Sequence, residues 1–248
     1  MNVIYVMWLR ELRRYVRSRA QIVASLGQPL LYLLGLGFGL GPVFQKAGQG
    51  NYLQFVAPGI IGMTILFSSI FSGAGLIFDR QFGFLKETLV APVPRIQIML
   101  GRTLGAATVA VMQSLLVAVV CLLCGFRPVD YRTLPLALVF MGLIAALFSS
   151  LGTAIGSSLE NIQGFQMIMS FLVMPIFFLS GALYPLNNLP RALNAVVMVD
   201  PLAYGVDSLR SILIGSSHFG LATDAAVLLS VGAVVLLVGS RLFSRIQA

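Results

Sequence analysis

The chain has 248 residues, of which 58% are hydrophobic and 10% are charged, and its formal net charge is +8. Soluble domains are about half apolar and about a quarter charged, so this composition excludes a soluble globular protein and indicates a polytopic membrane protein. In such a chain the surplus of Lys and Arg marks loops at the membrane surface, and no nucleic-acid partner is expected.

The first 20 residues predict an interfacial amphipathic helix. In "VIYVMWLRELRRYVRSR", apolar residues recur at helical spacing, and arginines occupy the other face. Trp8 and Tyr15 are expected at the depth of the lipid headgroups, while Arg10, Arg13, Arg14 and Arg17 face away from the apolar stripe. Two functions fit this helix equally well: an electrostatic membrane anchor, or a docking element for a cytoplasmic partner.

Six apolar windows follow, and each is long enough for a helix of about 20 residues that crosses the hydrocarbon. They are Ala20–Gln45, Ala47–Phe78, Thr103–Phe126, Thr133–Leu159, Asn161–Pro190 and a sixth near Leu221–Arg241. The first is too long for the apolar core of a signal peptide, so a retained span is expected. Eleven of the 16 Lys and Arg fall on the side of the termini, which places both termini in the cytoplasm.

The connection between spans 2 and 3, residues 79–100, contains the segment "FLKETLVAPVPR". Helical spacing of its apolar residues predicts a short two-faced helix from Arg80 to Val90. Pro92 and Pro94 then end it, because the residue before a proline is pushed to extended geometry. Such a helix passes motion between a soluble motor and the membrane bundle, or it simply lies on the lipid surface; the pattern alone leaves both open.

Residues 185–218 are too polar and too broken to cross the membrane. The breakers in "FFLSGALYPLNNLP" predict that span 5 stops near Tyr184. Two short helices then follow, lying at or dipping into the outer leaflet, where their backbone has to be covered by protein or line a wet cavity.

The residues of chemical catalysis are scarce. The chain has one histidine, His218, in a polar loop, and two cysteines, Cys121 and Cys124, in an apolar run. No metal site and no catalytic residue are expected. The phosphate-binding pattern G-x-x-x-x-G-K-[ST] does not occur, so any ATP has to be used by a partner. The spans carry almost no ionisable residues: Asp224 lies near the end of the sixth span, and Glu160 lies in a short cytoplasmic turn between spans 4 and 5.

Three segments carry a resemblance to a known family. "KETLVAPVPR" followed by "GRTLG", the stretch "FLSGALYPLNNLPRALNAVVMVDPLAYGVDSLR" and the span start "FVAPGIIGMTIL" resemble the ABC-2 family of ATP-binding-cassette permease subunits. The resemblance covers essentially the whole chain as a single transmembrane domain, residues 1–248. Its nearest branch contains the daunorubicin-type drug-export and nodulation-type lipo-oligosaccharide export permeases.

The resemblance implies two six-span subunits above two copies of a separate ABC ATPase, which holds the ATP and Mg²⁺, in a bacterial inner membrane. It implies that the segment between spans 2 and 3 is the coupling helix that contacts the ATPase, through Phe84, Leu85, Lys86, Glu87, Leu89, Pro92, Pro94 and Arg95. It makes residues 1–20 a connecting helix with Trp8, Arg10, Glu11 and Arg14. It also implies an outer lid that includes Tyr184, Pro185, Pro201, Tyr204 and Arg210.

The expected translocation path runs between the two copies. Its candidate residues on spans 2 and 5 are Met63, Phe67, Phe71, Met167, Phe171, Met174 and Phe178, although each of them also fits ordinary helix packing. The expected function is export of an amphipathic drug-like or lipid-linked substrate by alternating access. The alternatives are a polysaccharide or lipo-oligosaccharide exporter of the same family, a permease that extracts or senses lipids, and a proton-coupled secondary transporter.

Overall fold

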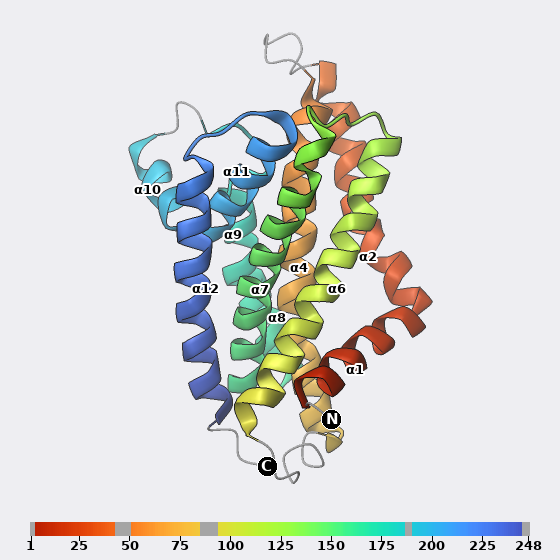
Figure 1. Cartoon of the computed structure of the whole chain (residues 1–248), viewed down its shortest axis with the longest axis vertical. Helices are drawn as coiled ribbons and strands as arrows, with labels where there is room; N and C mark the ends of the chain where they lie inside the picture. The colour runs from red at the N-terminus through yellow and green to blue at the C-terminus, as the bar shows by residue number, and fades with distance from the viewer. Residues whose placement is uncertain (1–2, 43–50, 85–93, 187–189, 245–248) are drawn as a thin grey trace.

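The computed structural model describes residues 3–42, 51–84, 94–186 and 190–244, which form a bundle of helices joined by turns (Figure 1). Within these residues the elements are α1 (Val3–Arg17), α2 (Arg19–Tyr32), η1 (Leu33–Phe38), α4 (Tyr52–Gln81), α6 (Arg95–Leu123), η2 (Tyr131–Thr133), α7 (Leu134–Ser158), α8 (Ile162–Ile168), η3 (Met169–Val173), α9 (Met174–Leu179), α10 (Arg191–Val199), α11 (Pro201–Ile214) and α12 (Leu221–Ser244).

The described residues contain six stretches that are long and apolar enough to cross a membrane, which confirms the all-α fold with six spans. They are Arg19–Phe38, Tyr52–Gln81, Arg95–Leu123, Tyr131–Ser158, Ile162–Leu179 and Leu221–Phe243. The start of α1 and the end of α12 lie at the same end of the bundle, called here the α1 end, and α10 and α11 lie at the opposite, α11 end (Figure 1).

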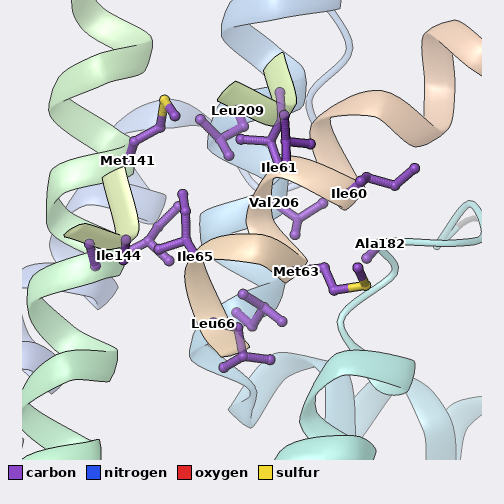
Figure 2. Close-up of a cluster of buried hydrophobic side chains, with 14 of the residues drawn as sticks. Ile60, Ile61, Met63, Ile65, Leu66, Met141, Ile144, Ala182, Val206 and Leu209 are labelled. Carbon is purple, nitrogen blue, oxygen red and sulfur yellow. The ribbon is translucent and has the colours of Figure 1, made fainter. Parts of the chain in front are cut away.

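Helix α4 is the centre of the bundle. In its most apolar window 72% of the residues are buried, against 17% for the first span and 22% for the fifth. Figure 2 shows side chains of α4, among them Ile61 and Ile65, meeting Ile144 of α7 and Val206 and Leu209 of α11. The first and fifth spans therefore lie at the periphery of the single chain.

Glycines let α4 and α7 approach each other closely. A Cβ atom added at Gly73 would collide with the backbone of Gly152, and one added at Gly156 would collide with the backbone of Gly73. Small residues at such positions bring two backbones into contact inside a membrane, where no hydrophobic force distinguishes helix from lipid. This seam holds the two central helices together toward the α1 end.

The spans differ from the predicted windows at their ends. The third span begins at Arg95, not at Thr103, so Arg95 and Arg102 belong to α6 and not to the preceding loop. The helix predicted from Arg80 to Val90 does not begin there: Arg80 is part of α4, which ends at Gln81, and Gly83 has a φ of 80°. A left-handed residue such as Gly83 interrupts a helix, so α4 does not continue into the connection.

The fifth span is irregular and shorter than predicted. It consists of α8, a π-helical turn at Met169–Val173, and α9, which ends at Leu179. Gly181 has a φ of 72°, so the chain turns away before Tyr184, where the stop was expected. The two short helices predicted after it are α10 and α11. All but three of the α11 residues are buried, because the helix packs among α4, α7 and α12.

Candidate functional site

Helix α1 packs along the first turns of α6. Gly101 and Gly105 make room for it, since a Cβ atom at Gly101 would lie 2.8 Å from the Ile4 carbonyl oxygen and one at Gly105 would lie 2.8 Å from Cβ of Glu11. The indole Nε1 of Trp8 donates a hydrogen bond to Oγ1 of Thr108 at 3.0 Å. The apolar stripe of α1 thus contacts its own bundle, and its partner was not evident from the spacing alone.

Four charged residues join α1 to α4 and α6 at this point. Asp79 lies between two guanidinium groups, with its Oδ2 at 2.6 Å from Nη2 of Arg10 and 2.7 Å from Nη1 of Arg102. Glu11 adds weaker pairs, at 3.6 Å to Arg10 and 3.9 Å to Arg102. We call these four residues the α1 junction. A charge buried as deeply as that of Arg102, whose side chain is 6% exposed, needs such partners.

The α1 junction lies at the two ends of the connection between spans 2 and 3. Asp79 is on the last turn of α4, and Arg102 is on the second turn of α6. Any displacement of that connection therefore acts on helices that ion pairs tie to α1. Sequence reasoning named Arg10 and Glu11 but missed Asp79 and Arg102. The sequence did contain a signal for this pair, because an acid and a base flank one loop in a chain that has few charged residues.

The structure describes three of the predicted ATPase-coupling residues. Phe84 lies just after Gly83 and is 55% exposed. Pro94 is the N-cap of α6, and Arg95 is its first residue. The others, Leu85, Lys86, Glu87, Leu89 and Pro92, lie outside the described residues.

A cavity of about 500 Å³ lies next to the α1 junction, between α1, α2, α4 and α6. We call it the α1 cavity. Its lining combines amide, hydroxyl, charged and apolar side chains: Glu11, Arg14, Tyr15, Gln21, Ala24, Ser25, Gln28, Pro29, Met63, Thr64, Phe67, Ser68, Phe71, Ser72, Ala74, Gly75, Phe78, Ala106, Val109 and Gln113.

The predicted path residues divide into two groups. Met63, Phe67 and Phe71 of α4 line the α1 cavity. The span 5 residues do not line it, and their exposed fractions are high: Met167 62%, Phe171 79%, Met174 38% and Phe178 48%. The single chain therefore leaves this face of the fifth span uncovered, while the opposite face, with Phe165 and Phe177, packs against Phe71 and Phe67.

At the α11 end, the predicted lid residues hold the connection after span 5 onto the bundle. The guanidinium group of Arg210 lies 4.0 Å from the centre of the Phe55 ring and donates a hydrogen bond to the Gly181 carbonyl at 3.0 Å. The hydroxyl of Tyr204 donates to the Met198 carbonyl at 2.8 Å. Pro201 opens α11, and Tyr184 and Pro185 are half-buried beside it.

Two buried acids at this end were not predicted as site residues. Asp207 accepts hydrogen bonds from the backbone N–H of His218 at 2.9 Å and of Phe219 at 2.8 Å, which pins the turn before α12. Asp200 caps α11 by accepting from the N–H of Leu202 at 2.9 Å. Burial raises the pKa of the Asp200 carboxyl to about 7, although the Leu202 hydrogen bond acts in the opposite direction.

Nothing in the described part of the chain resembles a metal centre, since it contains no group of three or more His, Cys, Asp or Glu that could hold an ion. The sites that the structure brings together are a charged junction beside a loop, a mixed polar and apolar cavity, and a packed cap at the other end.

Residues 2–214 match the family described as ABC-2 type transporter. The chain is 30% identical to Nodulation protein J of Rhizobium meliloti (strain 1021) over 210 residues, which cover 83% of this chain and 79% of that protein. It is 26% identical to Nodulation protein J of Rhizobium leguminosarum bv. viciae, over 96% and 92% of the two chains. It is also 26% identical to the inner membrane transport permease YadH of Escherichia coli (strain K12), over 89% and 86%. The chain belongs to the ABC-2 type transporter family and is a permease subunit of an ATP-binding-cassette exporter.

Proposed function

We propose that two copies of this chain pair in a bacterial inner membrane, with both termini in the cytoplasm, and work with two copies of a separate ABC ATPase. The ATPase binds ATP and Mg²⁺, and this chain supplies the path. The substrate is an amphipathic, drug-like or lipid-linked molecule that leaves the cytoplasm or the inner leaflet by alternating access. A polysaccharide or lipo-oligosaccharide is the alternative substrate within the same mechanism.

The α1 junction is the observation that carries this proposal. Asp79 and Arg102 flank the connection that the ATPase would contact, and Arg10 extends the ion pairs to α1. A displacement of the connection between spans 2 and 3 would therefore act on α4, α6 and α1 together. Since α4 is the most buried span, its movement is transmitted to the helices packed around it.

The orientation and the pairing have their own support. The α1 end carries the start of α1, the end of α12 and the helix ends that flank the connection between spans 2 and 3, with most of the described Lys and Arg, so the positive-inside rule supports a cytoplasmic position for this end. The exposed Met and Phe side chains of the fifth span form an apolar face that a second copy would cover. The path between the copies then includes that face.

The experiment is purification of the tagged chain from its native host in mild detergent, with identification of bound proteins and measurement of ATP hydrolysis. We expect an equimolar ABC ATPase, and its loss when Glu87→Arg and Leu89→Asp are combined. The matched control is Arg191→Glu with Leu193→Asp at the α11 end, which also reverses charge and places an acid at an exposed leucine. An ATPase-free preparation, or equal loss in the control, contradicts the proposal.

A proton-coupled carrier is the second candidate, and one observation favours it. Asp224 is 0% exposed, and within the described residues neither of its carboxylate oxygens has a hydrogen-bond partner. A buried acid in a span is a common element of proton paths. Transport that persists without ATPase, follows an imposed pH gradient and is abolished by Asp224→Asn would support this function over the first.

A further inference from the structure

The α1 cavity has a polar wall whose side chains take no part in the ion pairs of the α1 junction. Gln21, Ser25 and Gln28 fall on one face of α2, and Gln113 of α6 also lines the cavity although it is 5% exposed. Amide side chains are costly in an apolar span unless they find hydrogen-bond partners. Their convergence on one cavity, from two different spans, is therefore a feature that packing alone does not explain.

A buried hydroxyl group on the same wall lacks a hydrogen bond of good geometry within the described residues. Tyr15 is 3% exposed, and its hydroxyl makes no well-formed hydrogen bond within the described residues, although Gln113 and Ser25 lie beside it. Buried polar atoms are nearly always bonded, so an exception calls for a ligand or solvent partner. The hydroxyl belongs to a residue that lines the α1 cavity, where a ligand would complete its hydrogen bonding.

The opposite wall is apolar and aromatic. It is formed by Met63, Phe67 and Phe71 of α4 and by Val109 of α6. Met63 is 1% exposed and belongs to the core, whereas Phe71 is 55% exposed, so the lining extends from the core to the surface of the chain (Figure 2 shows Met63 in the core). One wall suits a polar headgroup and the other suits an apolar body.

The charges in the lining give no net preference for an anionic headgroup. Glu11 and Arg14 carry the formal charges among the described lining residues, and these cancel. Glu11 is engaged with Arg10 and Arg102, at 3.6 and 3.9 Å. Arg14 is solvent-exposed, so it offers an anion no buried cation. Amides and hydroxyls, which both donate and accept, match a neutral headgroup that carries hydroxyl or amide groups.

We propose that the α1 cavity binds the neutral, hydroxyl- or amide-bearing headgroup of the transported amphiphile within a single subunit, before the substrate reaches the path between the two copies. This inference rests on the proposed function. The volume of about 500 Å³ is within the range of about 300–1,000 Å³ that is usual for small-molecule sites. Because α1 forms both a wall of the cavity and part of the junction, an occupied cavity also acts on the residues that flank the coupling connection.

The test uses the full chain, together with any ATPase that copurifies with it, in phosphatidylcholine nanodiscs. The probe is a monoglucosyl diacylglycerol with a photoreactive diazirine on the sugar, and mass spectrometry maps the crosslinks. We expect crosslinks on α2 and α6 that unlabelled glucosyl diacylglycerol suppresses and phosphatidylglycerol does not. Gln28→Met with Gln113→Met keeps side-chain size but removes two amides, and should weaken labelling by at least about tenfold. Ala24→Trp, which fills the cavity, should also abolish it.

The control is Gln166→Met, at an exposed glutamine of α8 that does not line the cavity. It should label like the natural chain, and all variants should elute from size exclusion as folded protein. Labelling that maps elsewhere, that survives both cavity variants, or that phosphatidylglycerol suppresses equally overturns the inference. Labelling is read on the permease itself, so failure to bind an ATPase would contradict the proposed function and leave this measurement of the cavity intact.

Discussion

Asp79 of α4 and Arg102 of α6 form an ion pair with 2.7 Å between Oδ2 and Nη1, although the whole connection between spans 2 and 3 separates them in sequence. Arg10 of α1 approaches the same oxygen at 2.6 Å. One carboxylate thus links three helices at the end of the bundle where both termini lie (Figure 1).

This linkage predicts an order of stabilities. Asp79→Asn leaves the buried Arg102 with only its weaker 3.9 Å pair to Glu11, and breaking a buried pair in this way costs roughly 3–5 kcal/mol. Arg10→Ala should cost roughly 1 kcal/mol or less, because the Arg10 side chain is 37% exposed and Asp79 keeps Arg102. Thermal unfolding of both variants in the same detergent measures the difference, and equal melting temperatures would contradict this account of the junction.

The fluorescence of Trp8 reports how α1 packs on α6, because Trp8 is the only tryptophan of the chain. Gly101→Ala places a Cβ atom 2.7 Å from Cβ of Met7 and should displace α1. The Trp8 indole then loses its bond to Thr108, and its emission should shift to the red. Gly142→Ala, at a helical glycine with no atom within 4 Å of the added Cβ, is the control that should leave the spectrum unchanged.

Asp200 predicts a pH-dependent stability. Its pKa is raised from 3.8 to about 7 by burial, so the folded chain keeps a proton that the unfolded chain releases between these values. The free energy of unfolding should therefore fall as the pH rises through this window, by roughly 1.4 kcal/mol per pH unit. Above pH 7 the stabilisation is lost.

Asp200→Asn keeps an N-cap acceptor and removes the ionisation. We expect it to raise the melting temperature at pH 8 and to have little effect at pH 4. Asp130→Asn is the matched control, because Asp130 caps Arg132 in the same way, with a 2.8 Å bond, at an exposed site. A similar change of pH dependence in both variants would show that burial of Asp200 is not its cause.

The turn before α12 should loosen when Asp207 is removed. Asp207→Ala takes away the acceptor of the His218 and Phe219 N–H groups, and bonds to a charged acceptor are worth roughly 1.5–3 kcal/mol each. Hydrogen exchange at these two amides should accelerate by at least about tenfold. Ser216→Ala, in the same exposed turn, is the control and should leave the exchange of both amides unchanged. Unchanged exchange in Asp207→Ala would show that other contacts hold the turn and would contradict the prediction.

Particular residues show where sequence reasoning was limited. The third span was predicted from Thr103 because a charge-free window stops at Arg102, but Asp79 neutralises that arginine and lets α6 start at Arg95. The stripe of α1 was predicted, whereas its partner was not, since Gly101 and Gly105 lie about 90 positions further along the chain and mark close approach only once the two helices meet. Helical spacing of Met and Phe on span 5 could not separate the exposed Phe171 from the buried Phe177.

The sequence by itself determined the class of the molecule, the number of spans and the family, because apolar length, the placement of Lys and Arg and a few local motifs are properties of contiguous residues. Only the tertiary structure decided which residues far apart in the sequence meet: Asp79 with Arg102, Trp8 with Thr108, and Arg210 with the Gly181 carbonyl. These contacts depend on how the helices are rotated and how closely they pack. In an apolar chain, almost any face of a span can meet either lipid or another helix.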